Sequence, residues 1–266
     1  MERVKSLRRR MGLTGTTCAL LCGLGGLMAG NVAAAGQAQP SPNIRDYVVG
    51  KLDDFSANIH LVRYDANAGR RINKDFGTIY EFMKKATGDM KLTYKEADML
   101  RVDGRFGPRS AAYIVNNTDQ WVRYPALGIN THMDLGQSPG KRKTLLDVGL
   151  ISEDYLSYTE AQFINSRPVN GVICAVFSIS YKDKTLDTSH RLVWIDPKTK
   201  VTLKREEYSQ TGKMLSIWYY HDPKEVAPGI YMPESIEVDD SQGKPAGETA
   251  YRNIKVNQGV EATLFK

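Results

Sequence analysis

The sequence predicts a mainly β protein, an α+β fold in which a single curved antiparallel sheet forms a half-barrel with helices covering its concave face. After Asn170 the chain is a succession of strand-like segments with almost no helix between them. These segments are rich in β-branched and aromatic residues and are separated by turn clusters such as Asp196-Pro197-Lys198. Because apolar residues occupy both alternating faces, helices or a ligand must cover the second face.

The first element in chain order is a targeting segment at residues 1–35. Arg3 and Lys5 begin a basic stretch, a glycine-rich apolar run follows, and Ala33-Ala34-Ala35 offers a small-residue cleavage site. This layout is typical of a secretory signal peptide, so we expect a periplasmic or otherwise exported protein that is cut after Ala35. The alternative is a permanent membrane anchor, for which the run is short against a span of about 20 residues.

Removal of this segment changes the charge and the cysteine content. The formal charge of +6 falls to +2, because five basic residues and Glu2 leave and 31 basic residues then face 29 acidic ones. So small an excess predicts no nucleic-acid binding, which needs clustered basic residues. Cys174 is the one cysteine of the mature chain, so no disulfide is expected. The 231 remaining residues are enough for one domain with a large core.

The mature chain is expected to begin with a flexible, proline-bearing tether at residues 36–42, followed by a single domain over 43–266. The domain opens with a predicted amphipathic helix that has Ser41 or Asn43 as its N-cap. Its apolar residues follow helical spacing: Ile44, Tyr47, Val48, Leu52 and Phe55.

From Ile59 the apolar period becomes two, which predicts strands within residues 59–66, 77–86, 89–104, 110–117 and 120–127. Asn116-Asn117-Thr118-Asp119 is a hairpin turn by composition. A loop at 136–143, a short helix at 144–150 and a segment at 154–163 that suits helix or strand lead into the final strands. The total is about ten strands, one long helix and one or two short ones.

Residue types that carry chemistry lack the spacing that catalysis or metal binding needs. The four histidines are far apart in the sequence, and no G-x-S-x-G elbow is present. The pairs Glu206-Glu207 and Asp239-Asp240 point to opposite faces of their strands and are interpreted as solvated strand ends. We therefore predict no catalytic residue, no metal site and no cofactor. A hydrolase with carboxylates gathered from separate strands remains the enzymatic alternative.

The aromatic residues of the strands suggest an apolar cavity. Such a cavity suits acyl chains, because burying each methylene gains about 0.8 kcal/mol. Ordinary core packing is the alternative for each residue. The cavity candidates are Trp121, Phe177, Trp194, Met214, Trp218 and Tyr220.

Several segments, in this order, resemble the LolA-like family of periplasmic outer-membrane lipoprotein-sorting and lipid-binding proteins. They are the strand around Cys174, the W-I-D-P turn at Trp194 to Pro197, the G-I-Y-M-P entry at Gly229 to Pro233, and the closing Asn257 to Phe265. The resemblance implies a half-barrel with helices as a lid over an apolar cavity for acyl chains. The carrier's functional arginine lies in a K-R-P step, where this chain has Tyr94-Lys95-Glu96, so that role is not transferred.

Two functional hypotheses follow. The first is an exported, non-enzymatic, monomeric carrier that binds lipid or lipoprotein acyl chains in its cavity. The second is an envelope sensor or regulatory module that binds a protein partner through the same fold.

Overall fold

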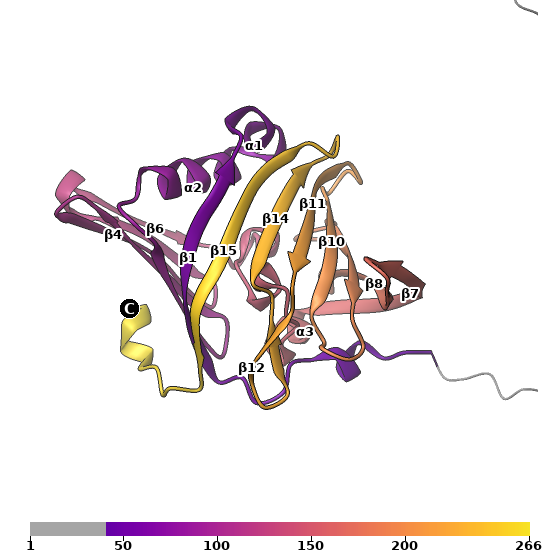
Figure 1. Ribbon diagram of the computed structural model, residues 1–266. Helices are drawn as coiled ribbons and strands as arrows, with labels where there is room; N and C mark the ends of the chain where they lie inside the picture. The colour runs from indigo at the N-terminus through magenta and orange to yellow at the C-terminus, as the bar shows by residue number, and fades with distance from the viewer. Residues whose placement is uncertain (1–40) are drawn as a thin grey trace, which may run out of the picture. The chain divides into compact units, whose positions relative to one another are not determined.

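One antiparallel sheet of thirteen strands organises the part of the chain that the structure describes, residues 41–266 of a computed structural model (Figure 1). The predicted signal peptide and most of the predicted tether lie outside these residues. From edge to edge the strands are β6 (Ile129–Asp134), β5 (Asp119–Tyr124), β4 (Arg109–Asn116), β3 (Met99–Phe106), β2 (Met90–Lys95), β1 (Asp54–Tyr64), β15 (Pro245–Val256), β14 (Ser235–Asp240), β11 (Met214–His221), β10 (Thr202–Tyr208), β9 (His190–Ile195), β8 (Val172–Tyr181) and β7 (Thr159–Val169).

Short helices and a second small sheet complete the described residues. The α-helices are α1 (Ala66–Ile72), α2 (Lys74–Lys85) and α3 (Glu153–Tyr158). The 3-10 turns are η1 (Ile44–Tyr47), η2 (Pro125–Leu127), η3 (Pro139–Lys141), η4 (Leu145–Val148) and η5 (Ala262–Phe265). β12 (Lys224–Ala227) pairs with β13 (Ile230–Met232). Among residues 41–266, no helix combines the length and the apolar character that crossing a membrane requires.

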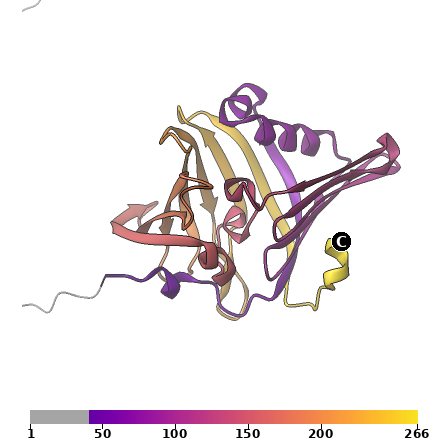
Figure 2. The same ribbon diagram turned by 180° about the vertical axis from the view of Figure 1, so that it is seen from behind.

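The sheet consists of two meanders that meet at its centre. β1 to β6 follow one another in space, and β7 to β11 continue through β14 to β15. The two meanders join where β1 pairs with β15, with Phe55 opposite Val256. β6 and β7 are the two free edges, and no pairing closes them onto each other within residues 41–266. The predicted fold class, a curved antiparallel sheet with helices on its concave face, is confirmed (Figures 1 and 2).

Directly paired residues of antiparallel strands point to the same face, so the register defines an inner and an outer face. The inner face carries the helices. A Cβ added at Gly104 would lie 3.4 Å from the Phe82 ring of α2, and Tyr155 of α3 packs in one cluster with Phe177 and Val193. The outer face of β4 carries Ala112 and Ile114, which are covered by Phe265 of η5.

The prediction of a helix from Ile44 to Phe55 is wrong. The helical segment, η1, ends after Tyr47, because Val48 forms a β-bridge with Ile151 and the backbone then extends toward β1. Phe55 is fully buried in β1, where it stacks on Tyr94 of the neighbouring strand at 5.4 Å. These apolar residues therefore do not form one face of a helix, and Phe55 packs within the sheet instead.

The prediction of a strand over residues 77–86 is also wrong, since this segment forms most of α2. Asn73 caps the helix by accepting a hydrogen bond from the Phe76 amide at 2.7 Å. Phe76 and Tyr80 lie one turn apart, stack at 4.4 Å and are both buried against the sheet. The cap and this pair outweigh the alternating pattern that suggested a strand.

The predictions for the middle of the chain are largely confirmed. Residues 116–119 connect β4 and β5 as a hairpin turn, with Asn117 at φ +55°. Residues 145–148 form a short helix, η4, which Gly149 ends at φ +86°. The ambiguous segment divides into α3 through Tyr158 and β7 from Thr159. The described residues hold fifteen strands rather than about ten, because several of the strands are short.

Candidate binding surface

The inner face of the sheet is the candidate binding surface, and one half of it is left partly uncovered. We call the inner face of β3 to β6 the open wing. Val102, Tyr113 and Val122 follow one another across it by direct pairing, and all three are half-buried. At its edge Ile129 and Met133 are 38% and 48% exposed. The open wing therefore offers apolar side chains that no helix fully covers.

α2 borders the open wing and continues its aromatic surface. Phe82 packs on Phe106 at 4.4 Å, and Phe106 packs on Tyr124 at 5.4 Å. A hollow of about 560 Å³ lies beside the helix. Its lining comes from β1, α1 and α2: Tyr64, Arg70, Gly77, Thr78, Glu81, Phe82 and Lys85.

The other half of the inner face is covered by a segment that we call the strap, residues 135–150, which runs from the end of β6 toward α3 (Figure 2). Hydrogen bonds tie it to the sheet, since Tyr181 Oη donates to the Pro139 carbonyl at 3.2 Å and Tyr220 Oη donates to the Leu146 carbonyl at 2.9 Å. Its apolar side chains are buried: Leu145, Leu146, Val148 and Leu150.

A buried charge cluster lies beneath the strap. Arg205 of β10 is 1% exposed, and its guanidinium carbon lies 4.3 Å from the centre of the Trp218 ring. It reaches Asp147 of the strap at 3.4 Å and Glu207 of its own strand at 3.5 Å. Nε of Arg205 has no hydrogen-bond partner within the described residues.

Arg191 of β9 extends the cluster. Its Nη1 donates to Tyr181 Oη at 2.7 Å and to Tyr155 Oη at 3.2 Å, and its Nε lies 3.5 Å from Glu207. Burial by itself raises the pKa of the Glu207 carboxyl, but the positive charges of Arg205 and Arg191 outweigh burial and lower this pKa. The carboxylate is therefore ionised at neutral pH.

The strap carboxylate behaves in the same way. Burial raises the pKa of Asp147, yet the charges of Lys143 and Arg205 and the hydrogen bond from the Thr144 amide lower it overall. The cluster thus contains two arginines and two carboxylates, all charged.

A second polar contact links the strap side of the molecule to the first meander. Tyr158 Oη of α3 donates to Asp98 Oδ2 at 3.0 Å, in the turn between β2 and β3. Asp98 is 6% exposed. Burial is the largest cause that raises the pKa of Asp98 to about 6, with repulsion from Asp154 adding to it and the Tyr158 hydrogen bond opposing it.

This raised pKa predicts an unusual pH dependence of stability. An acid whose pKa is higher when folded stabilises the protein below its unfolded pKa, and this contribution is lost as the pH rises through about 6. Asp98→Asn keeps an acceptor for Tyr158 and removes the charge. We expect it to raise the free energy of unfolding by about 2 kcal/mol at pH 7 and by almost nothing at pH 4. Urea denaturation at both pH values measures this difference, and an equal effect at both would contradict it.

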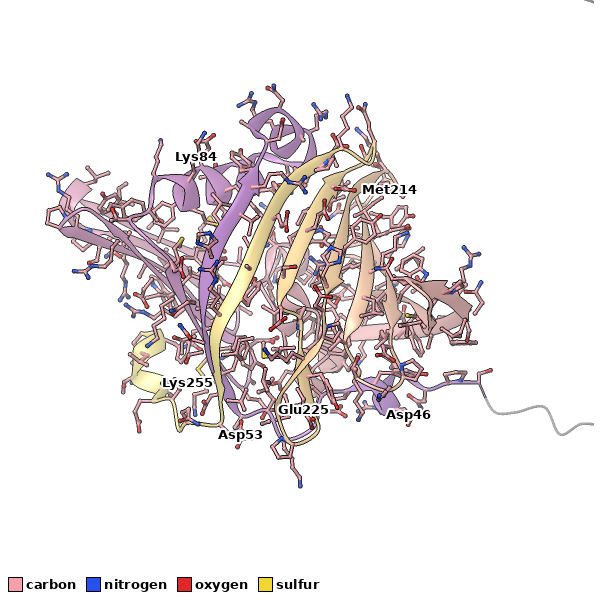
Figure 3. All side chains as sticks on the ribbon, viewed as in Figure 1. Asp46, Asp53, Lys84, Met214, Glu225 and Lys255 are labelled. Carbon is pink, nitrogen blue, oxygen red and sulfur yellow. The ribbon has the colours of Figure 1, made fainter. Side chains whose placement is uncertain are left out.

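The six cavity candidates lie in different places. Trp218 and Tyr220 lie together on the inner face of β11 and flank Arg205. Phe177 is buried on the inner face of β8 against Tyr47. The other three lie elsewhere. Trp121 stacks on His132 at 4.9 Å on the outer face, and Trp194 lies on the face opposite to Val193, with Lys204 Nζ 4.5 Å from the centre of its ring. Met214 begins β11 at the end of the sheet where α1 lies (Figure 3).

The interpretation of the paired carboxylates as solvated strand ends is wrong for two of them. Glu207 belongs to the charge cluster, and the Asp240 side chain is fully buried with its Oδ2 2.6 Å from Arg71 Nε. Arg205, Arg191 and Asp147 were not among the predicted site residues. Arg205 could have been found from the sequence, because in the strand that ends in Glu207-Tyr208 it falls on the same alternating face as the apolar residue Leu203. No group of three or more His, Cys, Asp or Glu side chains among residues 41–266 is arranged to hold a metal ion.

One known protein family matches this sequence. A protein-family model described as "Uncharacterized protein" matches residues 110–266, more than half of the chain. The chain belongs to this family. No curated protein matches the sequence. The match begins at the second residue of β4 and continues through β15, and therefore includes the strap and the charge cluster.

Solved structures share the fold. A domain from Vibrio parahaemolyticus described as an outer membrane lipoprotein-sorting protein has a TM-score of 0.55 at 16% identity, over 84% of this chain and 92% of that one. A LolA superfamily protein from Nitrosomonas europaea has a TM-score of 0.56 at 16% identity, over 83% and 93%. A DUF1329 family protein from Desulfovibrio piger has a TM-score of 0.50 at 12% identity, over 84% and 93%. The fold is LolA-like, as the sequence resemblance implied.

Proposed function

We propose that the protein is an exported, non-enzymatic binding protein that holds the acyl chains of a lipid or lipoprotein against the inner face of its sheet. The observation that carries this proposal is the open wing. On its outer face η5 covers Ala112 and Ile114 of β4, whereas its inner face leaves Val122, Ile129 and Met133 in contact with solvent. An apolar face left accessible on the concave side favours an apolar ligand.

The energetics support acyl chains in particular. Each methylene that moves from water to an apolar surface gains about 0.8 kcal/mol, so a long chain needs no catalytic or strongly polar partner to bind. The LolA-like fold supports the same class of ligand, because the Vibrio parahaemolyticus domain with this fold is described as lipoprotein-sorting. Export rests on the signal-peptide pattern of residues 1–35.

A carboxylate placed in the open wing tests the proposal. Val122→Asp should lower the affinity for a fluorescent fatty acid at least tenfold, because a charge would be buried beneath the chain. The matched control is Val172→Asp at the tip of the β7–β8 hairpin, where Val172 is already 37% exposed. The control should bind as the wild type does. Equal binding by all three proteins would exclude the open wing as the acyl site.

Native mass spectrometry of the protein purified from its own host provides the direct test. We expect a fraction of the molecules to carry a lipid mass that organic extraction removes. A mature mass that begins at Gly36 would confirm export with cleavage after Ala35. Protein recovered without lipid, which also fails to take up fatty acid, would argue for the alternative of a partner-binding module.

A further inference from the structure

We propose that the strap occupies the site of an anionic lipid, and that the negative headgroup of the ligand replaces Asp147 beside Arg205 when the strap is displaced. This inference rests on the proposed function and specifies its ligand: an anionic lipid whose headgroup end lies beside Arg205 and whose acyl chain continues onto the open wing.

Arg205 is poorly satisfied for a buried cation. Its contacts to the Leu146 carbonyl, Asp147 and Glu207 lie between 3.3 and 3.5 Å. Charge-assisted hydrogen bonds are usually about 2.7–2.9 Å long. In addition, Nε has no partner within the described residues. The guanidinium therefore retains donor capacity that a better-placed anion would use.

The charge balance shows what the ligand must supply. Asp147 and Lys143 belong to the strap and leave with it, whereas Arg205, Arg191 and Glu207 belong to the sheet. The sheet alone then has two positive charges and one negative charge beneath the strap. A buried site with one uncompensated positive charge is unfavourable, and a single anionic group restores neutrality.

The strap also places apolar side chains where the first methylenes of such a ligand, next to the headgroup, would lie. Leu145, Leu146 and Val148 are buried beside the carboxylate of Asp147, within the same four-residue turn. Tyr220 and Trp218 form the sheet side of this contact. Apolar side chains next to one carboxylate have the chemistry of an acyl chain next to its headgroup. A fatty-acid carboxylate and an alkyl phosphate both have this chemistry.

The strap leaves the sheet at a defined position. Gly149 ends the turn at φ +86°, and its carbonyl accepts a hydrogen bond from the Thr202 amide at 2.8 Å. A Cβ at Gly149 would lie 2.8 Å from the Tyr220 ring, so the close packing of the strap on Tyr220 requires glycine. Displacement of residues 144–148 would expose Arg205 while the strap remains attached at this point.

Three probes of equal chain length test the inference: dodecanoate, dodecyl phosphate and 1-dodecanol. Each would displace a fluorescent fatty acid from the full mature chain. The wild type should bind one of the anionic probes about tenfold more tightly than dodecanol. Asp147→Asn, which removes the competing internal carboxylate, should raise the affinity for that anion about tenfold more than it raises the affinity for dodecanol. The control is Asp222→Asn, at an exposed position after β11, and should change neither value.

The outcomes separate this inference from the proposed function. If all three probes bind equally and Asp147→Asn changes nothing, the inference is overturned while acyl binding stands. If no probe binds, both are overturned. Should Asp147→Asn fail to fold, Glu207→Gln replaces it, since it also removes a negative charge from Arg205 and should increase the preference for the anion. A preference for carboxylate over phosphate, or the reverse, would identify the headgroup.

Discussion

Replacing Gly247 of β15 with valine should destabilise the protein by at least about 3 kcal/mol and detach α2 from the sheet. A Cβ at this position would lie 2.2 Å from Tyr80 Cε1, and Tyr80 is a buried residue of α2. Tyr80 cannot move alone, because it stacks on Phe76 at 4.4 Å and on Tyr64 at 5.4 Å. Chemical denaturation measures the loss, and limited proteolysis within α2 reports the detachment.

The matched control is Gly50→Val, since a Cβ at Gly50 meets no atom within 4 Å. It should change the free energy of unfolding by less than about 0.5 kcal/mol. The double variant Gly247→Val with Tyr80→Ala should recover part of the loss, because the smaller residue makes room for valine. A full loss in the double variant would show that Tyr80 is not the group that requires glycine.

Replacing Arg205 with methionine should be almost as destabilising, at about 3 kcal/mol, because Asp147 and Glu207 would face each other without their shared cation. The double variant that also carries Asp147→Leu should be closer to the wild type in stability, since Glu207 then stays paired with Arg191 and apolar residues often replace a buried ion pair without loss. Denaturation curves of the single and double variants measure both values.

This pair of variants separates structure from binding. If the charges serve only to hold the strap, the double variant should show the same ratio of affinities for dodecanoate and dodecanol as the wild type. If they form a headgroup site, it should bind both probes with one affinity. A single variant as stable as the wild type would show that Arg205 contributes little to folding.

The second meander could be predicted well from the sequence, because its strands are neighbours in the chain. Alternation and turn residues are local signals, and hairpins such as that around Gly212 pair segments a few residues apart. The hairpin turn at Asn117 was predictable for the same reason. The pairing of β1 with β15 was not, since it joins residues such as Phe55 and Val256, which lie at opposite ends of the domain.

The candidate site was less predictable than the fold. An aromatic residue in a strand is recognised easily, but its face depends on the register. Val193 and Trp194 are neighbours in sequence and lie on opposite faces. The charge cluster could be predicted only by knowing where the strap lies, because Asp147 is 58 residues from Arg205 and no local pattern connects them.

The central seam between β1 and β15 determines when the molecule can become complete. β1 is the first strand of the domain and β15 is the last, so the first meander can acquire its central neighbour only after almost the whole chain has been made. Contacts so distant in sequence slow folding, because the entropy of closing a long loop is lost before the strand pairing that compensates for it can form. One edge of β1 therefore stays unpaired until the last strand of the domain arrives.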